Sequence, residues 1–168
     1  MINSARIIYK GDTFASLFYL GIGLFMLSTA FLLQYFKVSL GFLYLSFGLA
    51  AFSIYCIGKG LIMLYIYQKR HQYYLGISEL SQLQKNEEIL YTENRIIRKH
   101  RGRRMHVYIM VVGSIVAVLS VFAKEKGLIM GSSIPIVLLS GIEFSLGLLT
   151  EFRLQEYLRI LKKSGNAS

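Results

Sequence analysis

The sequence is poor in the residues that build catalytic and metal centres. Its 168 residues include one cysteine, one proline and no tryptophan, and only 9 acidic side chains stand against 19 Lys and Arg. A lone cysteine, Cys56, excludes an intrachain disulfide and a multi-cysteine metal site, and its apolar surroundings indicate a packing residue. Phosphate-binding glycine loops and the His-Glu-x-x-His zinc motif are also missing. We therefore expect no catalytic residue set, no bound metal and no cofactor.

Charge is absent from long stretches of the chain. Hydrophobic residues make up 54% of the sequence and charged residues 17%, whereas soluble domains carry about 25% charge. Four apolar stretches reach or approach the roughly 20 helical residues that cross a hydrocarbon core. They cover residues 14–36, 38–60, 106–123 and 127–150. The sequence predicts a single all-α domain over residues 1–168, a polytopic membrane protein with a bundle of four transmembrane helices.

Positive charge is concentrated on one side of these spans. Most Lys and Arg precede the first span, separate the second from the third, or follow the fourth, whereas the two short turns carry Lys37, Lys124 and Lys126. Basic residues are retained on the cytoplasmic side of membranes. Both termini and the middle segment should therefore be cytoplasmic, with the plasma (inner) membrane as the expected location. Orientation and attraction to anionic lipid headgroups account for the net charge of +10 better than nucleic acid does.

The second and fourth spans are predicted to continue as helices into the cytosol. No strong loop signal follows residue 60, so residues 61–105 are predicted to form a basic, largely helical segment, with Asn86 as a candidate break. Residues 151–168 form a second, amphipathic extension. The predicted bundle thus has cytosolic helical extensions.

Six basic residues are clustered immediately before the third span. They are Arg95, Arg98, Lys99, Arg101, Arg103 and Arg104. Three interpretations compete: an anchor to anionic headgroups of the inner leaflet, a surface for a protein partner, and a contact with nucleic acid. The lipid anchor is favoured, and nucleic acid is disfavoured because the cluster adjoins a membrane span.

Two charged residues fall within the apolar spans or at their edge. Glu143 lies at a depth within the hydrocarbon layer, nearer its cytoplasmic side, and Lys59 lies at a comparable depth. A carboxylate there is costly unless it is paired, protonated or hydrated. Either the two residues pair, within or between protomers, or Lys59 extends to the inner headgroups and Glu143 is a neutral, hydrogen-bonded acid. The sequence leaves both alternatives open.

Small polar residues recur at heptad spacing on the second and fourth spans. Ser46 and Ser53 are seven residues apart, as are Ser133 and Ser140, so each pair lies on one helix face. These stripes indicate a packing seam between helices, or alternatively a polar pathway across the membrane. Pro135, the only proline, is expected to kink the fourth span.

The two hairpins also resemble each other weakly. An offset of 87 residues pairs Ser46 with Ser133 and Gly48 with Pro135. A duplicated hairpin would give two parallel halves related by an axis along the membrane normal. Apolar composition alone also produces such matches, so duplication stays an open alternative.

Three functions are compatible with these patterns. Small-residue faces that four spans leave uncovered predict a homo-oligomer, and the first hypothesis is a non-enzymatic, channel-like or membrane-permeabilising module whose polar surface includes Glu143. The second is an accessory or scaffold subunit that recruits a partner through its basic cytosolic helices. The third and least favoured is a membrane enzyme acting on lipid, with Glu143 as acid or base.

Overall fold

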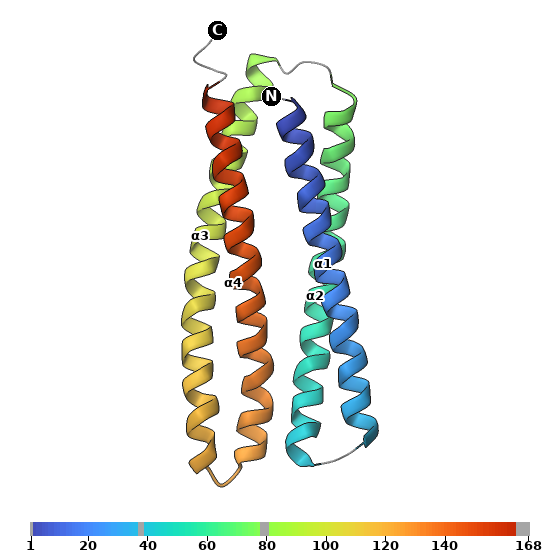
Figure 1. Cartoon of the computed structure of the whole chain (residues 1–168), viewed down its shortest axis with the longest axis vertical. Helices are drawn as coiled ribbons and strands as arrows, with labels where there is room; N and C mark the ends of the chain where they lie inside the picture. Colours follow the sequence, from blue (N-terminus) through green and yellow to red (C-terminus); the bar gives the residue numbers. More distant parts are fainter. Residues whose placement is uncertain (1, 37–38, 78–80, 164–168) are drawn as a thin grey trace.

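The computed structural model contains four long helices arranged as two hairpins (Figure 1). It describes residues 2–36, 39–77 and 81–163, so the first predicted turn and the end of the predicted tail lie partly outside the described residues. The helices are α1 (Ile2–Phe36), α2 (Leu40–Leu75), α3 (Gln82–Leu119), which continues into the short 3-10 helix η1 (Ser120–Phe122), and α4 (Lys126–Lys163). The predicted all-α class is confirmed, and each of the four helices is long and apolar enough to cross a membrane.

Helices α2 and α4 form the centre of the bundle. Helix α1 packs along α2 and α3 along α4, and the hairpins meet mainly where α2 lies against α4. In Figure 1, α2 and α4 run in the same direction. The end of α1, the start of α2 and the turn between η1 and α4 lie at one end, whereas the start of α1, the end of α2, the start of α3 and the end of α4 lie at the other. We refer to these as the turn end and the terminal end.

Glycines determine how closely α2 and α4 approach. A Cβ on Gly131 would lie 2.5 Å from the carbonyl oxygen of Gly41, and a Cβ on Gly48 would lie 2.7 Å from Cγ of Pro135. Larger side chains would therefore force the helices apart. Gly48 and Pro135 are the positions that the 87-residue offset aligns, so the hairpins pack in the register that a parallel repeat would have. These small-residue faces are covered within one chain and do not by themselves require a second copy.

The connection between α2 and α3 corrects one expectation. Helix α3 continues through Asn86 without a break. Its start is set by Ser81, whose hydroxyl accepts a hydrogen bond from the backbone N–H of Gln84, while the Gln84 side chain accepts one from the N–H of Ser81. This reciprocal capping box starts a helix upstream of Asn86. The interruption lies earlier, after α2 ends at Leu75.

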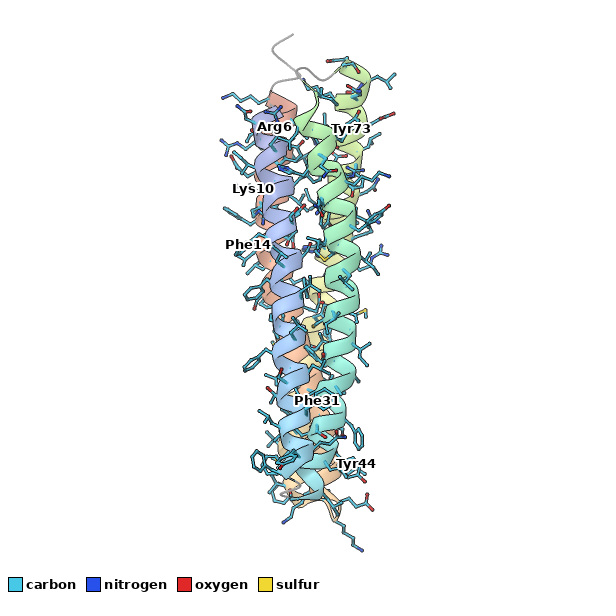
Figure 2. All side chains as sticks on the ribbon, turned by 90° about the vertical axis from the view of Figure 1, so that its right-hand side faces the viewer. Arg6, Lys10, Phe14, Phe31, Tyr44 and Tyr73 are labelled. Atoms are coloured by element: carbon cyan, nitrogen blue, oxygen red, sulfur yellow. The ribbon has the colours of Figure 1, made fainter. Side chains whose placement is uncertain are left out.

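The outside of the bundle is apolar between its two ends. Phe14 and Phe31 on α1 are 71% and 63% exposed, and Val112 on α3 is 59% exposed. Figure 2 shows Phe14 and Phe31 along the shaft, with Arg6 beyond them at the terminal end. Proteins in water rarely expose contiguous apolar surface on this scale, whereas lipid-facing helices do so normally. The interior is narrow, and Cys56 is a buried free thiol within it, as its packing role requires.

The contacts between the two hairpins are not symmetric. Helix α1 contacts α4, but no Cα of α3 lies within 8 Å of a Cα of α1 or α2 among the described residues. Helices that pack directly have axes about 8–10 Å apart. Helix α3 therefore stands away from α2, and long polar side chains bridge part of the intervening space.

Candidate functional site

Lys59 of α2 and Glu143 of α4 form an ion pair within one chain. The Lys59 ammonium also donates to the Tyr19 hydroxyl at 3.2 Å, and Glu143 accepts from the hydroxyls of Tyr19 at 3.0 Å and Tyr55 at 3.1 Å. The side chain of Glu143 is 6% exposed and that of Lys59 is 23% exposed. Of the two alternatives from the sequence, the structure therefore contains the pairing. The additional hydrogen bonds matter because a buried pair is stable only when its remaining polar valences are satisfied.

The four serines of the predicted stripes are all buried. Ser46, Ser53, Ser133 and Ser140 are each at most 6% exposed. Ser53 donates to the carbonyl oxygen of Gly23 on α1 at 2.8 Å, and Ser46 and Ser133 donate to carbonyl oxygens three residues earlier in their own helices. These contacts favour the packing seam over a pathway lined by hydroxyls. Pro135 is likewise buried, within a continuous α4, and its ring lies against α2.

The basic cluster is divided between two faces of α3. A cleft between α2, α3 and α4 is lined by Arg95, Arg98, Lys99 and Arg103. A groove on the outer side, between α3 and α4, is lined by His100, Arg101, Arg103 and Arg104. A helix has 3.6 residues per turn, so residues 95, 98, 99 and 103 share one stripe and residues 101 and 104 do not. The six residues are therefore not one continuous patch.

The basic cleft has a volume of about 400 Å³ and five cationic side chains. Lys59 joins the four basic residues of α3, and Glu143 is the only carboxylate among the described residues that line it. Lys59 and Glu143 belong to the predicted spans, whereas Arg95 and Lys99 lie beyond them. The cleft therefore straddles the limit of the predicted spans on the side of the terminal end.

Arg95 is a deeply buried cation of this cleft. Its side chain is 6% exposed and donates to Asp12 of α1 at 2.8 Å and to the Tyr67 hydroxyl at 3.0 Å. Burial alone would lower the pKa of Arg95, but the Asp12 carboxylate and the Tyr67 and Tyr91 phenols together outweigh burial and raise the pKa. Arg153 of α4 approaches the other Asp12 oxygen at 3.5 Å. One carboxylate of α1 is thus tied to both α3 and α4.

A second buried carboxylate, Glu88 of α3, joins all four helices at the terminal end. It is 4% exposed and accepts hydrogen bonds from Tyr9 of α1 at 2.5 Å, Tyr74 of α2 at 2.7 Å and Tyr157 of α4 at 3.4 Å. Arg70 of α2 lies 3.5 Å from it. Burial and the negative charge of Glu88 raise the pKa of all three phenols, which lie outside the predicted spans. The phenols therefore remain protonated and act as donors.

Asp12, Glu88 and the tyrosines around it are not among the site residues predicted from the sequence. A signal for them was present in the spacing. Glu88, Thr92 and Arg95 follow the i, i+4, i+7 pattern of one helix face, and all three are buried. All three residues of this face are polar, so the spacing shows that their side chains point the same way, but their partners on other helices cannot be read from it.

The geometry defines a class: an all-α bundle of four long apolar helices whose terminal end is held together by buried ion pairs. No group of three or more His, Cys, Asp or Glu side chains in the described parts of the chain is arranged to hold a metal ion. Comparison with protein-family models, curated protein sequences and solved structures found no match. The residues of the site are therefore the basis of the proposed function.

Proposed function

We propose that this chain is a non-enzymatic integral membrane protein with four transmembrane helices, both termini in the cytoplasm, that engages anionic lipid headgroups of the plasma (inner) membrane. One observation carries this proposal: the cationic side chains of α3 gather next to the predicted third span, on the side of that span that faces the terminal end. The exposed apolar shaft supports insertion in lipid. The shortage of basic residues at the turn end supports the orientation.

The outer groove contains two cationic side chains that form no ion pair among the described residues. Arg101 and Arg104 are exposed, and neither has an ion-pair partner among the described residues. Each Lys or Arg near an anionic leaflet contributes about 1 kcal/mol of attraction. The groove lies beside Phe152, an exposed aromatic residue of α4. Basic and apolar groups side by side suit the boundary between headgroups and acyl chains.

Cysteine labelling tests the orientation. In a Cys56→Ser background, Lys124→Cys at the turn end is expected to react with an impermeant maleimide from outside intact cells. Arg104→Cys, next to the predicted third span on its terminal-end side, is expected to react only after the membrane is breached. The two positions exchange one basic residue for the same thiol, so each controls for the other. The reverse labelling pattern would overturn the proposed orientation, and labelling of both positions from outside would overturn the spanning arrangement.

A channel-like homo-oligomer is the second candidate, because the basic cleft reaches the Lys59–Glu143 pair within the predicted spans. In that case, purified protein in liposomes is expected to conduct ions, and Glu143→Ala is expected to abolish the flux without changing the oligomeric mass. Glu125→Ala, an acid near the turn end, is the matched control and should conduct normally. A monomer without flux would eliminate this candidate. Retention of a soluble protein that is lost in Arg101→Gln/Arg104→Gln would instead favour the accessory-subunit hypothesis.

A further inference from the structure

We infer that the basic cleft between α2, α3 and α4 is a binding site for the phosphate monoester of a lipid headgroup. The inference rests on the proposed membrane function and goes beyond it, because it assigns one defined cleft and one headgroup chemistry in place of a diffuse attraction.

The cleft contains more cationic side chains than carboxylate partners for them. Three of its five cations already have carboxylate partners: Lys59 pairs with Glu143, Arg95 with Asp12 and Arg103 with Glu151. Arg98 and Lys99 have no ion-pair partner among the described residues, and both face the same cleft. A phosphate monoester carries a charge of about −1.5 to −2 near neutral pH. One such group would neutralise both free cations, whereas a phosphodiester would leave part of their charge uncompensated.

The environment of Lys99 also favours a bound anion. Its side chain is half-buried, and burial followed by the charge of Lys59 lowers the pKa of Lys99. A partly desolvated ammonium without a counterion is unfavourable. A bound dianion would relieve this cost, and Arg98 would add the forked donor geometry that guanidinium groups present to phosphate.

The cleft also has space for a ligand and a further hydrogen-bond donor in its wall. Gly102 lies in the wall of the cleft, and a Cβ added there would meet no atom within 4 Å. The volume of about 400 Å³ falls within the range of small-molecule sites. The Tyr67 hydroxyl accepts from Arg95, so its own proton remains available to a ligand oxygen. The cleft is therefore open space with donors directed at it.

The position of the cleft favours a lipid over free phosphate. It extends from Lys59 and Glu143, inside the predicted spans, to Arg98 and Lys99 beyond them. Headgroup phosphates lie at this boundary. Helix α3 has no close backbone contact with α2 along the described part of the chain. Two packed helices would have closed this space from that side.

The test uses full-length protein in nanodiscs of phosphatidylcholine that contain a minor fraction of phosphatidic acid, a monoester, or of phosphatidylglycerol, an anionic diester. Native mass spectrometry counts the lipids retained after release. We expect one retained phosphatidic acid per chain and weaker retention of phosphatidylglycerol. Arg98→Gln/Lys99→Gln should lower phosphatidic acid retention about tenfold or more, since two charge-assisted hydrogen bonds are lost. Lys10→Gln/Lys163→Gln removes the same charge from two exposed positions that do not line the cleft and should retain the lipid.

A second pair of variants leaves charge unchanged. Gly102→Leu should fill the cleft and also lower retention. Gly58→Leu is its control, since Gly58 is equally half-exposed, has equal free space and does not line the cleft. If both charge-neutralising pairs lowered retention equally, the assignment of the binding site to the basic cleft would be wrong. The proposed attraction of the protein to anionic headgroups would still stand. Retention unaffected by Gly102→Leu would also overturn the site. Inorganic phosphate that bound with lipid absent and displaced phosphatidic acid at equal concentration would overturn the lipid assignment.

Discussion

Lys59→Leu is expected to destabilise the protein by about 3–5 kcal/mol, the typical cost of breaking a buried ion pair. Glu143 would keep its negative charge at 6% exposure and lose its cation. Glu143→Leu is expected to cost less, because Lys59 is 23% exposed and its long side chain can move into the basic cleft. Replacing both residues by Leu should cost less than the sum of the single changes, since no buried charge is then left unpaired.

A double-mutant cycle in detergent micelles measures this coupling from the unfolding free energies of the four proteins. The exposed pair of Lys162 and Glu93, which are 2.7 Å apart, provides the control. Its coupling should not exceed about 1 kcal/mol, as for other surface pairs. If the Lys59 and Glu143 substitutions were additive within about 0.5 kcal/mol, the pair would not stabilise the contact between α2 and α4.

Glu88→Ala is expected to have a comparable effect, about 3–5 kcal/mol, because several donors lose one acceptor. Tyr9 and Tyr74 would keep buried hydroxyls without their carboxylate partner, and each hydrogen bond to a charged group contributes about 1.5–3 kcal/mol. Glu87 is the adjacent residue on α3 and is exposed. Glu87→Ala should change stability by less than about 0.5 kcal/mol.

The two closest donors to Glu88, Tyr9 and Tyr74, lie on different helices, so local protection provides a second measurement. Glu88→Ala should speed amide hydrogen exchange at the terminal ends of α1 and α2 and leave their turn ends unchanged. Equal unfolding free energies for Glu88→Ala and Glu87→Ala would show that Glu88 does not hold the helices together. Uniformly faster exchange along α1 would contradict the local role assigned to the tyrosine cluster.

The helices themselves were predictable because their signals are local. Long apolar stretches place the four apolar helices, and the absence of a loop signal after residue 60 predicts that α2 continues beyond its span, as it does to Leu75. The boundary that failed, Asn86, depended on a weak breaker residue. The Ser81 capping box, a stronger start signal, determines the beginning of α3.

The site residues were only partly predictable. Glu143 and Lys59 were identifiable because charge is costly at that depth, but 84 residues separate them and their contact depends on how α2 lies against α4. The basic cluster was evident from composition. Its division between an inner cleft and an outer groove depends on how α3 is rotated against α4, which a dense run of Arg and Lys does not reveal.

The sequence by itself determined the helix class, the apolar part of each helix and the gathering of basic residues beside one end of the apolar stretches, since hydropathy and charge act residue by residue. Only the tertiary structure decided that Asp12 meets Arg95 across 83 residues, that Glu88 gathers tyrosines from three other helices, and that α3 stands apart from α2. The physical reason is that a charge buried among helices is stabilised by partners on its neighbours. Which helices are neighbours is settled by close contacts such as that between Gly48 and Pro135.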